Sequence, residues 1–179
     1  AVLLELLENH PGWHRSEVFS DGAALWEATR AQGLEGVVAK RWSSPYRPGV
    51  RSHDWIKAVH RSTTDLVVIG WRPESGRRAR IGSLVLAEVS DGELRYVGSA
   101  GSGMTQAVSD ALLGVLPGIR QADSPITVPG DLPDTNWVAP ALVVQVRHLG
   151  HTGDQQLRQP VITSLRPDLT AQDLLGLAD

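Results

Sequence analysis

The pattern of apolar and polar residues divides the chain into two parts with different predicted structure. In the first part, apolar residues at helical spacing predict helices over residues 1–9 and 21–32, the second with Asp21 as its N-cap. Short extended segments are predicted at residues 13–19, 34–40 and 53–59. Residues 43–49 contain two prolines and a glycine, which predicts a loop.

From Thr64 onward, short β segments alternate with turn residues such as Asp91-Gly92. Strands are predicted at residues 65–71, 82–89, 94–98 and 142–148, and a helix at residues 105–116. A proline-rich stretch that ends at Pro140 predicts a long connection, which cannot be a central strand. Thr170 and Asp173 resemble a capping box that opens a last short helix.

Several strands with one inserted helix are typical of a small β-barrel of the OB-fold type. The expected fold class is therefore α+β, mostly β, with a boundary between residues 60 and 61. Because Ala1 opens inside an apolar run without a cap, we expect the chain to be a piece of a longer protein, cut within a domain. Apolar side chains of residues 1–60 should then be exposed.

Composition excludes some classes of protein. A content of 41% hydrophobic residues in 179 can build one ordinary core and part of a second. No segment approaches the ~18 consecutive apolar residues of a membrane span, and no signal-peptide pattern is present, so we expect a cytoplasmic protein with no membrane partner. The absence of cysteine excludes disulfides and thiolate metal sites.

The net charge of −3 does not indicate a nucleic-acid-binding protein, so any such surface must be local. One basic cluster stands out in a predicted turn: Arg72, Arg77, Arg78 and Arg80. A solvated loop and a contact with DNA phosphates are both open interpretations of this cluster.

A glutamate and a lysine stand at the two ends of an otherwise apolar predicted strand. Strand alternation puts Glu35 and Lys40 on opposite faces. A carboxylate in a buried strand is costly unless it meets a metal or a positive partner, so Glu35 is a candidate ligand of a divalent metal. The alternative is a strand-end glutamate that reaches solvent.

A second lysine follows an aromatic and apolar pair. Trp55 and Ile56 favour an extended backbone from which Lys57 projects. A lysine held in this way supplies a point charge for a phosphate group. The alternative is a solvated lysine that protects a strand edge from aggregation.

Together these segments resemble, in order and spacing, motifs IV and V of the ATP-dependent DNA ligases, and above all the bacterial ligases of repair and end joining. They read Glu35-Gly-Val-Val-Ala-Lys-Arg41, Ser44-Pro-Tyr-Arg-Pro-Gly49 and Arg51-Ser-His-Asp-Trp-Ile-Lys57. The resemblance continues through residues 68–71, 82–86, 94–103, 157–160 and 165–168, and so covers nearly the whole chain.

The resemblance implies that residues 1–60 are the end of a nucleotidyltransferase (adenylation) domain and residues 61–179 an OB-fold domain. It implies a parent enzyme that seals nicks in duplex DNA, using ATP and a divalent metal (Mg or Mn), in the bacterial cytoplasm near the nucleoid. DNA-repair proteins are expected partners. The reaction passes through an enzyme-adenylate and a DNA-adenylate.

The resemblance also implies roles for individual residues. Glu35 would help to bind the metal, Lys57 would contact the phosphate of AMP, and Lys40 matches a motif position with a less defined role. Arg158 and Arg166 would bind the ATP phosphates from the OB-fold domain. The alternative for each arginine is a surface ion pair that contributes little.

The chain departs from the family pattern at three places. No Lys-x-Asp-Gly sequence is present, so the adenylated lysine is absent and the isolated chain should be inactive. Val59 and Leu169 stand where the family commonly has lysines, which removes positive charge from a phosphate site.

Two other functions remain open. One is an RNA ligase or capping-type nucleotidyltransferase. The other is a non-catalytic OB-fold module that binds single-stranded nucleic acid by stacking, for which Trp71, Tyr96 and Trp137 are the aromatic candidates.

Overall fold

A computed structural model describes residues 12, 16–75 and 77–176, in two compact units, Ala1–His60 and Arg61–Asp179. The helix expected over residues 1–9 lies outside the described residues. Residues 16–19, the described end of the strand expected over residues 13–19, form no strand, so that part of the prediction was wrong. None of the helices in these parts of the chain has the length and apolar character needed to cross a membrane.

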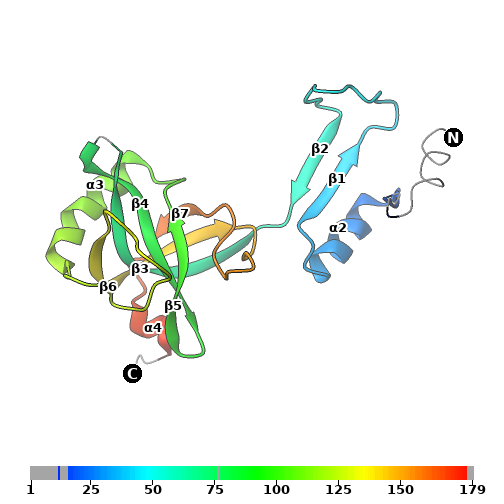
Figure 1. The fold of residues 1–179 in the computed structure, drawn as a ribbon. Helices are drawn as coiled ribbons and strands as arrows, with labels where there is room; N and C mark the ends of the chain where they lie inside the picture. Colours follow the sequence, from blue (N-terminus) through cyan, green and yellow to red (C-terminus); the bar gives the residue numbers. More distant parts are fainter. Residues whose placement is uncertain (1–11, 13–15, 76, 177–179) are drawn as a thin grey trace. The chain divides into compact units, whose positions relative to one another are not determined.

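The first unit consists of helix α2 (Gly22–Ala31) and the antiparallel strands β1 (Gly36–Lys40) and β2 (Trp55–Val59), drawn in blue to cyan in Figure 1. Asp21 caps α2 as predicted, because its carboxylate accepts the N–H groups of Ala23 and Ala24 at 3.0 Å. A loop over residues 41–54 joins the two strands.

The two strands approach each other most closely where β1 begins. The φ angle of Gly36 is 150°, a conformation that glycine adopts readily and other residues avoid. An added Cβ atom would overlap the carbonyl oxygen of Ala58 and lie 2.7 Å from Val59 Cα. The preceding residue is fixed as well, since His60 N–H donates to the Glu35 carbonyl at 2.9 Å. Only glycine fits this position.

Most apolar side chains of the first unit are exposed. Among its described residues only Thr29 is buried, with its hydroxyl 2.9 Å from Nε2 of His60. The large exposed side chains are Val18, Phe19, Leu34, Val38, Trp42, Tyr46, Val50, Trp55 and Ile56. The expected exposure of apolar surface in this unit is therefore confirmed.

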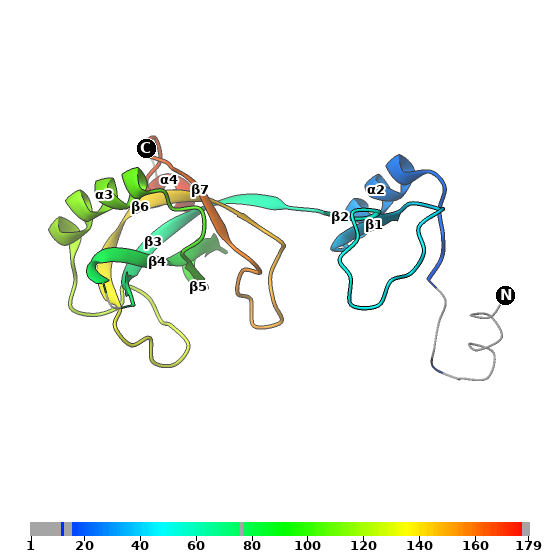
Figure 2. The same ribbon diagram turned by 90° about the horizontal axis from the view of Figure 1, so that it is seen from above.

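The second unit is a curved, antiparallel five-stranded sheet in the order β5-β4-β3-β6-β7. Its strands are β3 (Ser62–Glu74), β4 (Arg77–Ser90), β5 (Glu93–Ala100), β6 (Asn136–His148) and β7 (Val161–Leu165). Helix α3 (Gln106–Val115) and the 3₁₀ helix η1 (Leu116–Ile119) lie between β5 and β6 in sequence and against one side of the sheet (Figures 1 and 2). This topology is that of an OB-fold, so the predicted fold class is confirmed.

Helix α4 (Ala171–Leu175) ends the described chain and begins at the predicted capping box. The Thr170 hydroxyl accepts Asp173 N–H at 3.2 Å, and the Asp173 carboxylate accepts Thr170 N–H at 2.6 Å. The Thr170 hydroxyl also donates to the Asp173 carboxylate at 2.6 Å, and this bond, with that from Thr170 N–H, holds the pKa of Asp173 below its ordinary value.

Both faces of the central strand β3 are buried. Leu66 and Val68 point into one apolar cluster with Leu112 of α3, and Val67 and Ile69 point into a second cluster. The second cluster includes Ala171 of α4. Because each face meets a helix, β3 is a continuous apolar run rather than an alternating one.

One prediction about the strands was wrong, and one strand was not predicted. Pro140 lies inside β6, a strand that pairs on both sides. It is tolerated because the β3–β6 register shifts there: Val68 faces Leu142, but Gly70 faces Trp137, so the segment around Pro140 leaves the regular ladder. Strand β7 was not predicted, because it is short and follows a proline.

Backbone hydrogen bonds join the two edges of the sheet. Ile162 N–H donates to the Ser102 carbonyl, and Leu157 N–H to the Val97 carbonyl, both at 2.9 Å. Gly103 makes this approach possible: its φ is 86°, and an added Cβ atom would overlap the Ile162 carbonyl oxygen.

Gly103→Ala is expected to lower the free energy of unfolding by about 2–3 kcal/mol, because it combines a strained positive φ with a backbone overlap. Gly92→Ala is the matched control, since Gly92 also has a positive φ of 78° but nothing within 4 Å of an added Cβ. That variant should lose only about 1 kcal/mol. Urea unfolding followed by tryptophan fluorescence measures both, and equal losses would show that the overlap has no effect.

Candidate functional site

Glu35 and Lys57, from the two strands of the first unit, form an ion pair. Lys57 Nζ donates to Glu35 Oε1 at 2.5 Å. In a regular ladder Lys57 faces Val38, and alternation would put Glu35 on the opposite face. The unusual backbone at Gly36 interrupts that alternation, so the carboxylate reaches the lysine. Glu35 therefore meets a positive partner rather than only solvent.

Lys40 lies on the same face of the hairpin as Lys57. It pairs with Trp55 across the ladder, and its ammonium group lies 4.4 Å from the centroid of the Trp55 ring. Contacts of this kind contribute about 0.5–1 kcal/mol at exposed sites. The face thus carries two ammonium groups and the Glu35 carboxylate, which makes it positive and suited to an anion such as a phosphate.

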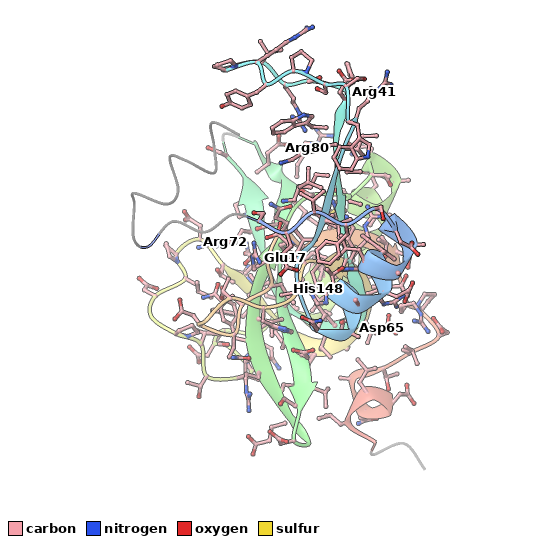
Figure 3. All side chains as sticks on the ribbon, turned by 90° about the vertical axis from the view of Figure 1, so that its right-hand side faces the viewer. Glu17, Arg41, Asp65, Arg72, Arg80 and His148 are labelled. Atoms are coloured by element: carbon pink, nitrogen blue, oxygen red, sulfur yellow. The ribbon has the colours of Figure 1, made fainter. Side chains whose placement is uncertain are left out.

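The rim of the hairpin carries a further ion pair. Arg41 Nε lies 3.0 Å from Asp54 Oδ1, and the backbone N–H of Arg41 donates to the Asp54 carbonyl at 2.9 Å. Figure 3 labels Arg41 at this end of the unit. These bonds fix the two ends of the loop over residues 41–54.

Glu35 is an incomplete metal site by itself. Within the described residues, no three His, Cys, Asp or Glu side chains gather closely enough to hold a metal ion. Magnesium often takes one or two carboxylates and completes its coordination with waters and substrate phosphates. Glu35 fits that arrangement as a single ligand, provided that phosphate oxygens supply other positions.

Arg166 is held by two carboxylates at the end of β7. Its Nη1 lies 2.6 Å from Asp65 Oδ2 on β3, and its Nη2 lies 2.8 Å from Asp168 Oδ2. Hydrogen bonding to Asp168 raises the pKa of Arg166 above its ordinary value, and Asp65 contributes to the same effect. In turn, Arg166 holds the pKa of Asp168 below its ordinary value. Arg166 therefore forms ion pairs, which was the alternative to its predicted contact with the ATP phosphates.

Arg158 lies in the connection between β6 and β7, apart from Arg166. Arg158 exchanges backbone hydrogen bonds with Leu149 and Gly150 at the end of β6, whereas Arg166 N–H donates to Val143 near the middle of that strand. Six strand residues separate those points, which is roughly 20 Å. The structure therefore does not bring the two arginines together.

One arginine of the basic cluster, Arg80, forms an ion pair. Arg80 Nη1 lies 3.7 Å from Glu74 Oε2 across the β3–β4 turn, and Arg72 lies on β3 nearby (Figure 3). The side chains of Arg77 and Arg78 lie outside the described residues.

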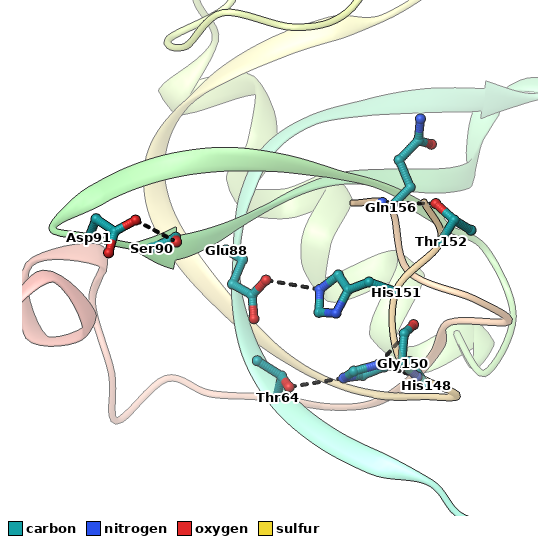
Figure 4. Close-up of polar contacts among 9 residues, drawn as sticks. All are labelled: Thr64, Glu88, Ser90, Asp91, His148, Gly150, His151, Thr152 and Gln156. Atoms are coloured by element: carbon teal, nitrogen blue, oxygen red, sulfur yellow. Dashed lines mark hydrogen bonds and ion pairs between the residues drawn. The ribbon is translucent and has the colours of Figure 1, made fainter. Parts of the chain in front are cut away.

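Sequence reasoning missed a histidine cluster at the end of β6. The rings of His148 and His151 lie 5.6 Å apart edge to face, and Glu88 Oε2 lies 3.0 Å from His151 Nε2 (Figure 4). The available signal was strand alternation, which places His148 on the same face as the buried Val144 and Val146.

Comparison with known proteins gives one family. The sequence family described as "ATP dependent DNA ligase domain" matches residues 13–58, and that described as "ATP dependent DNA ligase C terminal region" matches residues 77–169. The multifunctional non-homologous end joining protein LigD of Mycolicibacterium smegmatis is 39% identical over 159 residues, which are 87% of this chain and 21% of that protein.

Other relatives agree. A probable DNA ligase of Dictyoglomus turgidum is 33% identical over 151 residues, which cover 78% of this chain and 25% of that protein. The crystal structure of the ligase domain of LigD from M. tuberculosis has a TM-score of 0.59 and 35% identity, covering 94% of this chain and 56% of that one. The chain thus spans about a fifth to a quarter of the curated relatives.

Asp65→Asn is expected to lower the Tm of the second unit by about 4 °C, because Arg166 loses its less exposed anionic partner. Asp168→Asn is the control: the side chain of Asp168 is 60% exposed, against 25% for Asp65, so its loss should cost less. Differential scanning calorimetry compares the two variants. A larger effect of Asp168→Asn would contradict this ranking.

Proposed function

Because this chain belongs to the ATP-dependent DNA ligases, we propose that it supplies the end of the adenylation domain and the OB-fold domain of an enzyme that seals nicks in duplex DNA. The observation that carries the proposal is the face of the β1–β2 hairpin, where Lys57, Lys40 and Glu35 meet within a matched ligase segment. The relatives named for non-homologous end joining support the repair of DNA breaks as its setting.

In this proposal Lys57 binds a phosphate of the nucleotide. Its ammonium group neutralises charge on the oxygens around the phosphorus atom, and electrostatic stabilisation of that kind is the main task of a protein in phosphoryl transfer. The pair with Glu35 orients the lysine before the nucleotide arrives. Lys40, stacked on Trp55, adds positive charge to the same face.

Glu35 is the proposed ligand of a divalent cation, magnesium or manganese. When bound, the cation would neutralise phosphate charge beside Lys57. One carboxylate oxygen accepts a hydrogen bond from Lys57, which keeps the Glu35 carboxylate beside the proposed phosphate site.

The lysine that becomes adenylated must come from elsewhere, because this sequence contains no Lys-x-Asp-Gly. We infer that the chain works as part of a longer polypeptide and that the isolated chain does not form the enzyme-adenylate. The exposed apolar side chains of the first unit are consistent with that inference, since a larger domain would cover them.

In the OB-fold domain, Arg158 is the proposed contact for ATP phosphates. Arg166 is proposed as a second contact, but Asp65 and Asp168 already hold its guanidinium, so it would have to give up one of these partners. Val59 in the first unit and Leu169 in the OB-fold domain stand where the family commonly has lysines, so both proposed phosphate sites carry less positive charge than is common in the family.

The alternative of a stacking module for single-stranded nucleic acid lacks a platform. In residues 61–75 and 77–176, Trp71, Tyr96 and Trp137 are each partly buried and packed against the two apolar clusters. Binding by base stacking requires accessible ring faces.

Lys57→Ala in the full-length protein is expected to reduce ATP-dependent nick sealing by about a hundredfold or more, because the positive charge that stabilises the reacting phosphate is lost. Glu35→Ala should cause a loss of similar size, and Lys57→Arg a smaller one because positive charge is retained. The measurement is the rate of joining of a nicked duplex with magnesium and ATP.

Glu27→Gln, an exposed position on α2, is the control and should join nicks at the unaltered rate. Stability should hardly change in the Lys57 and Glu35 variants, since exposed ion pairs contribute about 0–1 kcal/mol. Full joining activity in Lys57→Ala would overturn the assignment of this face.

A further inference from the structure

His148 is a buried histidine with both ring nitrogens engaged. It is 3% exposed at the end of β6. Its Nδ1 accepts the backbone N–H of Gly150 at 3.1 Å, and because that nitrogen is an acceptor, Nε2 carries the proton and donates to the Thr64 hydroxyl at 3.0 Å. The geometry thus specifies the neutral ring in one tautomer, which ties β6 to β3 and to the turn that follows β6.

A second histidine extends this link to β4. The His151 ring meets His148 edge to face, and His151 Nε2 lies 3.0 Å from Glu88 Oε2 (Figure 4). His151 and Glu88 are the titratable groups that face His148: a charge on His151 opposes its protonation and the Glu88 carboxylate favours it. Burial has the largest effect and lowers the pKa of His148, against a smaller raising effect of the backbone contact with Gly150.

Backbone hydrogen bonds link the turn beside His148 to Arg158. Leu149 N–H donates to the Arg158 carbonyl, and Arg158 N–H donates to the Gly150 carbonyl, both at 2.9 Å. The Arg158 backbone is therefore hydrogen-bonded to the two residues that directly follow His148. Gly150 therefore links the ring to Arg158: its N–H donates to His148 Nδ1, and its carbonyl, which lies 3.4 Å from that nitrogen, accepts Arg158 N–H.

We propose that neutral His148 is a positioning residue that holds the β6–β7 connection in the conformation presenting Arg158, and that protonation of its ring releases this connection. The part that concerns nucleotide binding rests on the proposed function of Arg158. A proton on Nδ1 would point at the Gly150 N–H and would turn the ring toward the Gly150 carbonyl, which accepts Arg158 N–H. The first hydrogen bond is lost and the second is disturbed.

The sign of the pH dependence follows. Because folding lowers the pKa of His148, the unfolded chain binds the proton more readily, and the stability contributed at this site decreases as the pH decreases. The full contribution is present above the ordinary pKa of about 6.5 and is lost as the pH falls from there through the lowered folded-state value.

Amide hydrogen exchange of this chain at pH 7.5 and pH 5.0, corrected for intrinsic exchange rates, tests the structural part. Protection of the Leu149 and Arg158 amides should fall, by up to about tenfold for each pH unit between the two pKa values. Protection of Val144, in the middle of β6, should fall less. His148→Asn retains an acceptor near the position of Nδ1 and does not titrate, so it should keep protection at both pH values, whereas His148→Ala should lose it at both.

Unchanged protection of Leu149 and Arg158 in wild type at pH 5.0, or in His148→Ala at pH 7.5, would overturn the proposal. An equal loss at Val144 would do the same, because it would indicate general destabilisation rather than release of the connection.

Self-adenylation of the full-length protein tests the link to function. His148→Ala and Arg158→Ala should each raise the KM for ATP with a smaller change in kcat, and the double variant should be no worse than Arg158→Ala. If Arg158→Ala impairs adenylation but His148→Ala does not, the positioning role is wrong. If Arg158→Ala leaves the KM for ATP unchanged, the proposed function of Arg158 fails. The hydrogen-exchange result still decides the role of His148.

Discussion

Both compact units depend on contacts between backbones that leave no room for a Cβ atom. At Gly36 the first strand of the hairpin meets the backbone of Ala58 and Val59, and at Gly103 the segment after β5 meets the Ile162 carbonyl. Each contact brings together residues that are far apart in sequence. The first places Glu35 against Lys57, and the second joins the two edges of the OB-fold sheet beside the connection that carries Arg158.

Charge in this protein acts locally rather than over the whole surface. The net charge is −3, yet the hairpin face presents Lys40 and Lys57 together with the Glu35 carboxylate. Arg166, by contrast, has two carboxylates within hydrogen-bonding distance. A phosphate could therefore bind the ammonium group of Lys57 in competition with Glu35, whereas at Arg166 it would compete with both Asp65 and Asp168.

The sequence predicted most helices and strands because apolar periodicity and caps act over a few residues, as at Asp21 and Thr170. It failed where longer-range geometry decides. Pro140 fits inside β6 only because the register with β3 shifts there. Strand alternation placed Glu35 and Lys40 on opposite faces and did not predict the ion pair between Glu35 and Lys57, which depends on how the two strands meet at Gly36. His148 was missed: it shares a strand face with Val144 and Val146, but its partners Thr64 and Gly150 become visible only when β3 and the turn after β6 are in place.

The central claim is that the hairpin face around Lys57 binds the nucleotide phosphate. A crystal structure of the full-length protein in its adenylated form tests it most directly. The account predicts that Lys57 Nζ lies within hydrogen-bonding distance of a phosphate oxygen of AMP, with Glu35 beside it. A structure in which Lys57 still pairs only with Glu35, and the phosphate is bound by other side chains, would contradict the account.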